Sequence, residues 1–146
     1  MAKRKSETSA DKKKIEAMKN NGRVSLHNLY DECNSHLRVL DFYKGELKYL
    51  QKRLADIANE NTGRDILAKV EQFQNQFIIT GDNLDELKHT IKSQLKFIEK
   101  LIKQKPTHID EKTISDAGKY SQSIHDAEKG FAALKLRFNK FLATYL

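Results

Sequence analysis

Hydrophobic side chains recur at steps of three and four residues along most of this chain, a spacing that places them on one face of an α-helix. The members of the first stripe are Leu26, Tyr30, Cys33, Leu37, Leu40, Leu47 and Leu54, with Tyr43, Leu50 and Ile57 alongside. Ser25 is a suitable N-cap for this helix, and Asn59 to Asn61, followed by Gly63, favour its end. The pattern predicts one amphipathic helix over about 25–60.

The second stripe is the most regular in the chain, because it alternates steps of four and three over five heptads. Its members are Ile66, Val70, Phe73, Phe77, Thr80, Leu84, Leu87, Ile91, Gln94, Ile98 and Leu101. Thr62 and Asp65 have the spacing of a capping pair at its start. The phase passes unchanged through Gly81 and Asp82, which a loop of arbitrary length would rarely allow. We expect one helix over about 64–104, either straight or kinked at Gly81.

A third stripe follows Pro106 and runs to the end of the sequence. Lys105 precedes this proline and is therefore pushed out of helical geometry, while Thr107 and Asp110 resemble another capping pair. The members of the stripe are Ile114, Ala117, Tyr120, Ile124, Ala127, Phe131, Leu134, Phe138, Phe141, Leu142 and Tyr145. They predict a helix over about 108–145. Three long helices with short connections predict an all-α fold, an up-down-up antiparallel bundle shaped like a coiled-coil rod.

Residues 1–23 have no such stripe and are rich in Lys, Ser, Asn and Asp. Past Met1, their only sizeable apolar side chains are Ile15 and Met18, which are too few to bury. We therefore expect a disordered basic tail, or one that is transiently helical over 10–19. The chain then divides into the tail at 1–23 and the bundle at 24–146.

Antiparallel pairing also predicts which residues share a height along the rod. Reflection about the two turns brings together the glycines and nearby polar residues of one level, namely Lys44, Gly45, Thr80, Gly81, Glu128 and Gly130. An interior glycine costs a helix about 1 kcal/mol relative to alanine. Two interpretations remain open: glycines at exposed, tolerant positions, or a hinge or polar layer in which Lys44 meets Glu128.

Composition and charge narrow the class of protein. Of the 146 residues, 38% are hydrophobic and 32% are charged, which suits one domain of long, half-exposed helices better than a thick globular core. The net charge is +7, and residues 1–23 carry eight basic and three acidic side chains, hence +5 of it. The basic character therefore belongs mainly to the tail.

Basic residues give the strongest signal for a ligand. Lysines repeat at every fourth position from Lys88 to Lys100, and antiparallel order brings this end of the second helix beside the origin of the tail. The candidate phosphate-binding residues are Lys3, Arg4, Lys5, Lys12, Lys13, Lys14, Lys88, Lys92, Lys96, Lys100 and Lys103. Such a pole would bind DNA, RNA or anionic lipid without sequence preference and with strong salt dependence. A solvated lysine face that complements the helix dipole fits the same pattern.

The sequence contains no catalytic or cofactor-binding signature. Glu86 and His89 have the Glu-x-x-His spacing of di-iron bundles, but the stripe turns His89 outward and the motif has no second copy. Cys33 and His36 lie one helical turn apart, yet a structural zinc site needs four such donors. Neither common glycine-rich phosphate loop is present. We expect no metal, no cofactor and no enzymatic activity.

These patterns predict a protein that works through its helices. Leu50, Leu95 and Ile102 widen the stripes, which favours self-association or a partner helix, although the same width can serve the three-helix core. We expect a structural or adaptor protein, homo-oligomeric or bound to another helical protein, with non-specific nucleic-acid binding as the alternative. The lone cysteine, the absence of an N-terminal apolar run and the lack of a membrane-spanning segment point to the cytoplasm.

Overall fold

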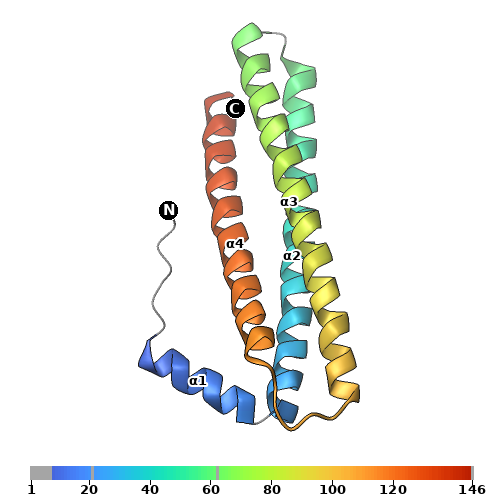
Figure 1. Ribbon diagram of the computed structural model, residues 1–146. Coiled ribbons are helices and arrows are strands. Elements are labelled where there is room, and N and C mark those ends of the chain that lie inside the picture. The colour runs from blue at the N-terminus through green and yellow to red at the C-terminus, as the bar shows by residue number, and fades with distance from the viewer. Residues whose placement is uncertain (1–7, 21, 62, 146) are drawn as a thin grey trace.

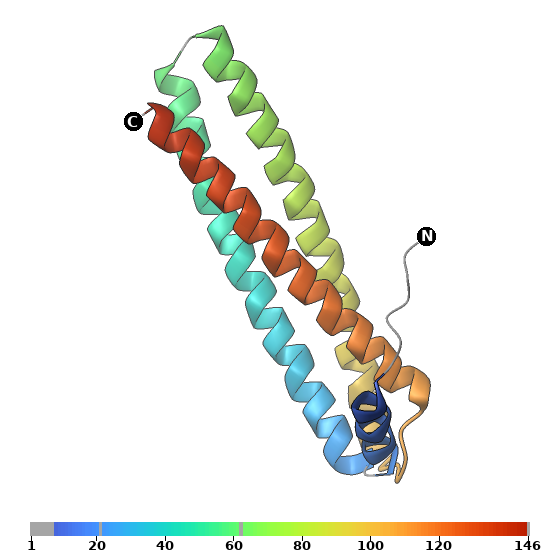
Figure 2. The same ribbon diagram turned by 90° about the vertical axis from the view of Figure 1, so that its left-hand side faces the viewer.

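Nearly all of the described residues are helical. The computed structural model describes residues 8–20, 22–61 and 63–145, which fold into α1 (Ser9–Asn20), α2 (Gly22–Glu60), α3 (Arg64–Lys103) and α4 (Glu111–Tyr145). These ranges contain no strand, so the all-α class predicted from the sequence is confirmed. Helices α2, α3 and α4 run up, down and up as a slender bundle, and α1 lies at its lower end (Figures 1 and 2).

The long helices begin and end close to the predicted positions. Helix α2 starts at Gly22, slightly before the predicted start at about 25, and α3 is continuous through Gly81. The N-cap residue of α3 is Gly63, which has an extended backbone and no side chain that could cap the helix. Thr62, the first member of the predicted capping pair, lies outside the described residues.

The connection between α3 and α4 is longer than the sequence pattern predicts. Lys105 takes a positive φ of 48° before Pro106, which turns the chain away from α3. Ile109 is 4% exposed and packs into the lower end of the bundle. The first backbone bond of α4 then runs from the Ile114 N–H to the Asp110 carbonyl at 3.3 Å. Helix α4 therefore begins at Glu111 rather than at about 108, because burial of Ile109 holds the preceding residues in a loop.

Helix α1 covers the segment for which the sequence predicts either a disordered tail or a transient helix over 10–19, and it adds a fourth helix to the three predicted. Its N-terminus is closed by a reciprocal pair: the Asp11 N–H donates to Thr8 Oγ1 at 3.1 Å, and the Thr8 N–H donates to Asp11 Oδ2 at 3.3 Å. Hydrogen bonding of the Asp11 carboxylate to the Thr8 side chain, and then to the Thr8 backbone N–H, lowers the pKa of Asp11. Ile15 packs against a buried cluster at the lower end of the bundle. The cluster consists of Leu26, Leu29, Ile98, Ile109 and Ile114.

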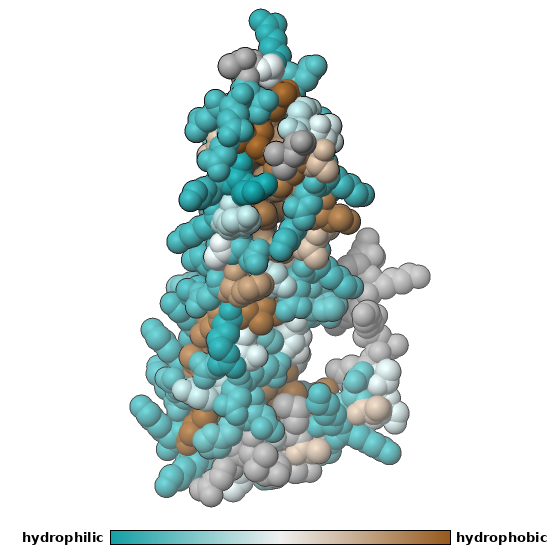
Figure 3. All heavy atoms as spheres, turned by 180° about the vertical axis from the view of Figure 1, so that it is seen from behind, coloured by the Kyte–Doolittle hydropathy of each residue, from teal (hydrophilic) through white to brown (hydrophobic). Residues whose placement is uncertain are grey.

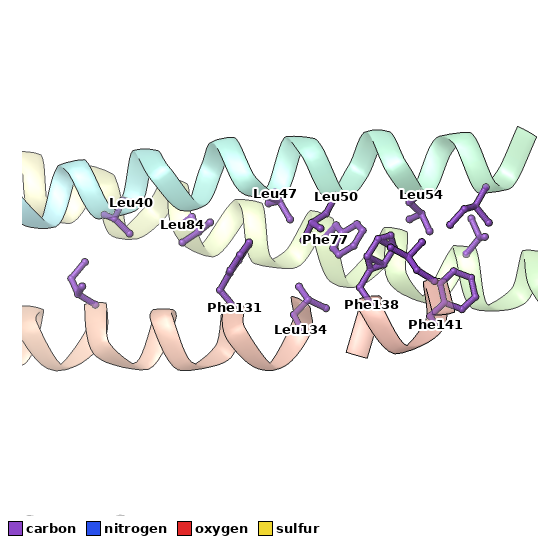
Figure 4. Packing of buried hydrophobic residues seen from close by; sticks show 14 of the residues in the cluster. Leu40, Leu47, Leu50, Leu54, Phe77, Leu84, Phe131, Leu134, Phe138 and Phe141 are labelled. Atoms are coloured by element: carbon purple, nitrogen blue, oxygen red, sulfur yellow. The ribbon is translucent and has the colours of Figure 1, made fainter. Parts of the chain in front are cut away.

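The main core is a column of apolar side chains between α2, α3 and α4 (Figure 4). Phe77 and Phe138 are fully buried, and their ring centroids lie 5.2 Å apart in an edge-on arrangement. Phe73 joins them, 5.3 Å from Phe138 and 5.2 Å from Phe141. Aromatic pairs of this geometry add stabilisation beyond the burial of their surface. This aromatic cluster fixes α4 against α3 in the upper half of the bundle.

Helices α2 and α3 form the closest pair in the described chain, whereas α4 touches both over a smaller surface. A Cβ atom added to Gly81 would lie only 3.3 Å from Leu47 Cδ2, so the glycine permits the close approach. Two ion pairs join the same helices: Lys44 Nζ lies 2.5 Å from Asp85 Oδ1, and Lys88 Nζ lies 2.6 Å from Asp41 Oδ1. The bundle is therefore a tight α2–α3 hairpin with α4 packed alongside.

The aromatic cluster yields a prediction for stability. Phe138→Ala removes a fully buried ring, so we expect it to lower the free energy of unfolding by about 3–5 kcal/mol in urea titrations followed by circular dichroism. Phe97→Ala is the matched control, because Phe97 is 46% exposed and should cost about 1 kcal/mol or less. Equal costs at the two positions would contradict this packing.

Candidate functional site

The predicted phosphate-binding residues fall into three groups. Lys3, Arg4 and Lys5 lie outside the described residues. Exposed lysines occur on α1 at Lys12, Lys13 and Lys14, and on α3 at Lys92, Lys96, Lys100 and Lys103. Lys88 is different because it donates to Asp41 of α2, and this bond lowers the pKa of Asp41. Lys88 therefore contributes to the α2–α3 contact. The other candidate lysines that the structure describes are exposed to solvent.

The two lysine groups share one end of the bundle, as antiparallel order predicts, but not one face. Helix α1 contacts α2 and α4, and it leaves the bundle on the side of α4, away from α3 (Figures 1 and 2). The two segments that carry these lysines, α1 and the last turns of α3, therefore lie on different sides of that end. A ligand that touched both groups would have to wrap around it.

The three glycines predicted to share a level have different surroundings. Gly81 lies in the close α2–α3 contact, whereas a Cβ atom added to Gly45 or Gly130 would meet nothing within 4 Å. Gly45 and Gly130 are thus exposed positions at which a side chain would be tolerated. This agrees with the first of the two interpretations offered by the sequence. Only the glycine of α3 has a packing role.

The polar contact expected at this level is not formed in the described chain. Lys44 pairs with Asp85 of α3 and not with Glu128 of α4. The reason is geometric: Lys44 lies on the side of α2 that faces α3, one turn away from the Asp41 that pairs with Lys88. Thr80 is half-buried and lines a groove between α3 and α4.

A polar layer does occur lower in the bundle, formed by Glu32 and His36 of α2, Gln94 of α3 and Ser121 of α4. The Ser121 hydroxyl donates to Glu32 Oε1, and His36 Nε2 lies 3.3 Å from both Ser121 Oγ and Glu32 Oε1. Gln94 lines a small cavity together with Glu32 and His36, and it is 8% exposed. Its Nε2 atom has no hydrogen-bond partner among the described residues. The polar side chains of α2 and α4 in this layer therefore bond to one another, whereas the amide nitrogen of Gln94 on α3 has no hydrogen-bond acceptor among the described residues.

This layer contains serine, histidine and a carboxylate, but its geometry does not suit nucleophilic catalysis. In a hydrolytic triad, the serine and the carboxylate bond to opposite ring nitrogens of the histidine. Here Ser121 and Glu32 both approach Nε2, so the imidazole cannot pass a proton from one to the other. The neighbouring Cys33 is no better, because burial, and then the charge of Glu32, raise its pKa to about 11. The arrangement is suited to holding α4 in register against α2.

A metal site requires a particular geometry of donor side chains, and a membrane span requires a long apolar helix. No group of three or more His, Cys, Asp or Glu side chains there is placed to hold a metal ion. Glu86 and His89 are both exposed, as the stripe predicted for His89. Across residues 8–20, 22–61 and 63–145, no helix has the length and apolar character needed to cross a membrane.

One open groove lies between α3 and α4, and a second lies mainly on α2, with Lys135 of α4 at its edge. The α3/α4 groove has a volume of about 450 Å³ and an apolar floor that includes Leu84, Leu87, Phe131 and Leu134. The α2/α4 groove, of about 510 Å³, is lined by Phe42 and Tyr49 among others. Several large apolar side chains on the outside of the bundle are about half exposed or more, including Phe42, Tyr49, Ile78, Ile79 and Leu136. Figure 3 shows such apolar side chains at the surface between hydrophilic ones.

The sequence analysis missed the polar layer and the grooves. Gln94 was visible as an amide at a stripe position, which is a signal for a buried polar contact. The rest of the layer could not be found in the same way, because Glu32 and Ser121 meet only through the parallel register of α2 and α4. The grooves depend on how far α4 lies from its neighbours, and spacing along a sequence does not contain that distance.

Comparisons with known proteins do not add a function. No protein-family model, curated protein or solved structure matches this chain. The functional argument therefore rests on the residues and on their geometry.

The unsatisfied amide of Gln94 leads to a prediction for stability. Gln94→Leu keeps a similar volume and removes a buried donor whose isolation costs about 1–3 kcal/mol, so we expect the free energy of unfolding to rise by about 1 kcal/mol. Ser121→Ala should lower it by a similar amount, since it removes the hydroxyl that Glu32 and His36 share. Urea denaturation measures both, and a large loss of stability in Gln94→Leu would show that the amide has a partner.

The raised pKa of Cys33 predicts slow thiol chemistry. At pH 8 the folded protein should react with a disulfide reagent such as DTNB at least about tenfold more slowly than the urea-unfolded chain, because the thiolate is the reacting form. The same pKa shift also determines how the stability of the fold changes with pH. The unfolded thiol ionises first, so stability should fall as pH rises from about 9 towards 11. Cys33→Ser, which has no thiol, should show no labelling, and fast labelling of the native wild type would contradict the burial.

Proposed function

We propose that this chain is a non-enzymatic structural or adaptor protein of the cytoplasm that acts through helix packing, by self-association or by binding a partner helix. The observation that carries the proposal is the pair of grooves, one between α3 and α4 and one mainly on α2, which leave apolar surface of the bundle uncovered. Grooves between helices accept the apolar face of a further helix, which is how helical bundles gain partners.

The exposed side chains beside these grooves support the proposal. Ile79 is 60% exposed next to the α3/α4 groove, and Phe42 is 61% exposed next to the α2/α4 groove. A single exposed apolar side chain is common, whereas apolar side chains gathered beside an apolar groove mark interaction surfaces. The proposal places such a protein in a reducing compartment because its lone cysteine is a free, buried thiol.

The second candidate is non-specific nucleic-acid binding, which one observation favours. Lys12, Lys13 and Lys14 are consecutive and exposed on α1, which stands at the edge of the bundle and can approach a phosphate backbone. Against it stands the position of the other lysines on a different side of the same end. This second function would therefore depend on α1 and on little else in the described chain.

Sedimentation equilibrium of the full chain, with and without a DNA duplex at about 50 and 200 mM salt, separates the two functions. If helix packing is the function, the protein should self-associate at micromolar concentration, with little effect of salt or DNA. Lys12→Gln/Lys13→Gln/Lys14→Gln is the matched variant and should assemble like the wild type. Tight DNA binding by the wild type at low salt, lost in the triple variant, would instead support the second candidate.

A further inference from the structure

The α4 rim of the α3/α4 groove carries two opposite charges that form no ion pair within the described chain. Asp126 accepts a hydrogen bond from Gln122 Nε2 at 2.9 Å, and Arg137 donates one to Gln76 Oε1 at 3.3 Å. Both charges line the groove. They lie about 16 Å apart along α4, at 1.5 Å per residue, so they are too far apart to pair with each other. The rim therefore offers one acidic and one basic position to a partner.

We propose that the α3/α4 groove is the interface of a homodimer, in which two copies pack about a twofold axis with their α4 helices antiparallel. This inference rests on the self-association proposed above and names its surface. A twofold interface brings the same patch of both copies together, so the patch must complement itself. With the axis passing between the two α4 helices, at the height midway between Asp126 and Arg137, Asp126 of each copy faces the partner subunit's Arg137, and the same ion pair forms twice.

The same axis also places an apolar side chain over an open position. Gln76 bonds to Arg137 and Phe77 packs on Phe138, so Ile79 of α3 lies at the height of about residue 135 of α4. Reflection about the axis brings the partner subunit's Ile79 to the height of about residue 128, between Ala127 and Gly130. Ile79 is 60% exposed, and a Cβ atom at Gly130 would meet nothing within 4 Å. The protruding side chain thus meets the smallest residues of the groove.

Two independent features, the charges and the apolar fit, therefore agree on one axis. The α2/α4 groove does not offer the same complementarity, because Lys135 Nζ already lies 3.2 Å from Glu46 Oε2 across it. Its charges are paired within the chain. The α3/α4 groove is the one whose rim charges are left for a second copy.

Gly130→Leu tests the apolar fit without disturbing the monomer. The added side chain meets no atom within 4 Å at its Cβ, but it fills the space that the partner subunit's Ile79 would occupy. Gly118→Leu is the matched control: Gly118 is also on α4, and its Cβ position is equally open. We expect Gly130→Leu to weaken dimerisation of the full chain at least about tenfold by sedimentation equilibrium, and Gly118→Leu to leave it unchanged.

Charge exchange tests the proposed pairing. Asp126→Arg and Arg137→Asp should each weaken the dimer, because each places like charges opposite one another, and the double variant should restore it. Circular dichroism should show the same helicity for all variants, since Asp126 and Arg137 make only exposed hydrogen bonds, to Gln122 and Gln76, within the monomer. Restoration in the double variant would not follow from a merely structural role of either residue.

The outcomes separate the two levels of the proposal. A dimer that is insensitive to Gly130→Leu and to the charge variants would overturn this interface and leave helix-mediated self-association standing. A chain that stays monomeric at every concentration would overturn the homodimer and also the self-association from which it is argued. A dimer weakened by Gly118→Leu as strongly as by Gly130→Leu would place the contact elsewhere on α4.

Discussion

The close packing of α2 against α3 is the constraint on which the rest of the molecule depends. Gly81 allows Leu47 to approach, and the pairs Lys44–Asp85 and Lys88–Asp41 hold the same two helices together along their exposed edge. Two helices alone cannot bury both of their stripes, so α4 lies over the apolar side that they leave open. Because α4 rests on a pair that is already closed, it stays farther from each neighbour than they are from one another. The groove between α3 and α4 is a direct result.

Much of this fold could be predicted from the sequence, because the apolar stripes are long and keep their phase. The stripe from Ile66 to Leu101 predicts a helix that continues through Gly81, and α3 does so. Phe77 and Phe138 lie at stripe positions and are fully buried. For α1 the sequence predicted only a disordered tail or a transient helix over 10–19, because the described contacts that stabilise it are local: the capping pair of Thr8 with Asp11, and the packing of Ile15 against the bundle. Such a helix has no stripe to detect.

The site was less predictable, since a reflection of residue numbers gives heights but not faces. It placed Lys44 near the level of Glu128, yet Lys44 lies on the α3 side of α2 and pairs with Asp85. The polar layer lies elsewhere, where Gln94 interrupts an apolar stripe and Ser121 meets Glu32. A buried polar layer commonly costs stability and favours one alignment of helices over others. Here it would favour the parallel alignment of α2 and α4, as do the ion pair of Lys135 with Glu46 and the ring contact of Tyr43 with Phe131.

The attachment of α1 has a consequence for local opening. Among the described side chains of α1, Ile15 packs against the bundle and is only partly buried, whereas complete burial of such a side chain contributes about 1.5–3 kcal/mol. The free energy needed to lift α1 from the bundle is therefore a small part of that needed to unfold the aromatic cluster. Amide hydrogens of α1 would exchange with solvent through this local detachment, while those beside Phe77 and Phe138 would wait for the whole bundle to open. Detachment of α1 would thus leave the aromatic cluster and the three long helices around it intact.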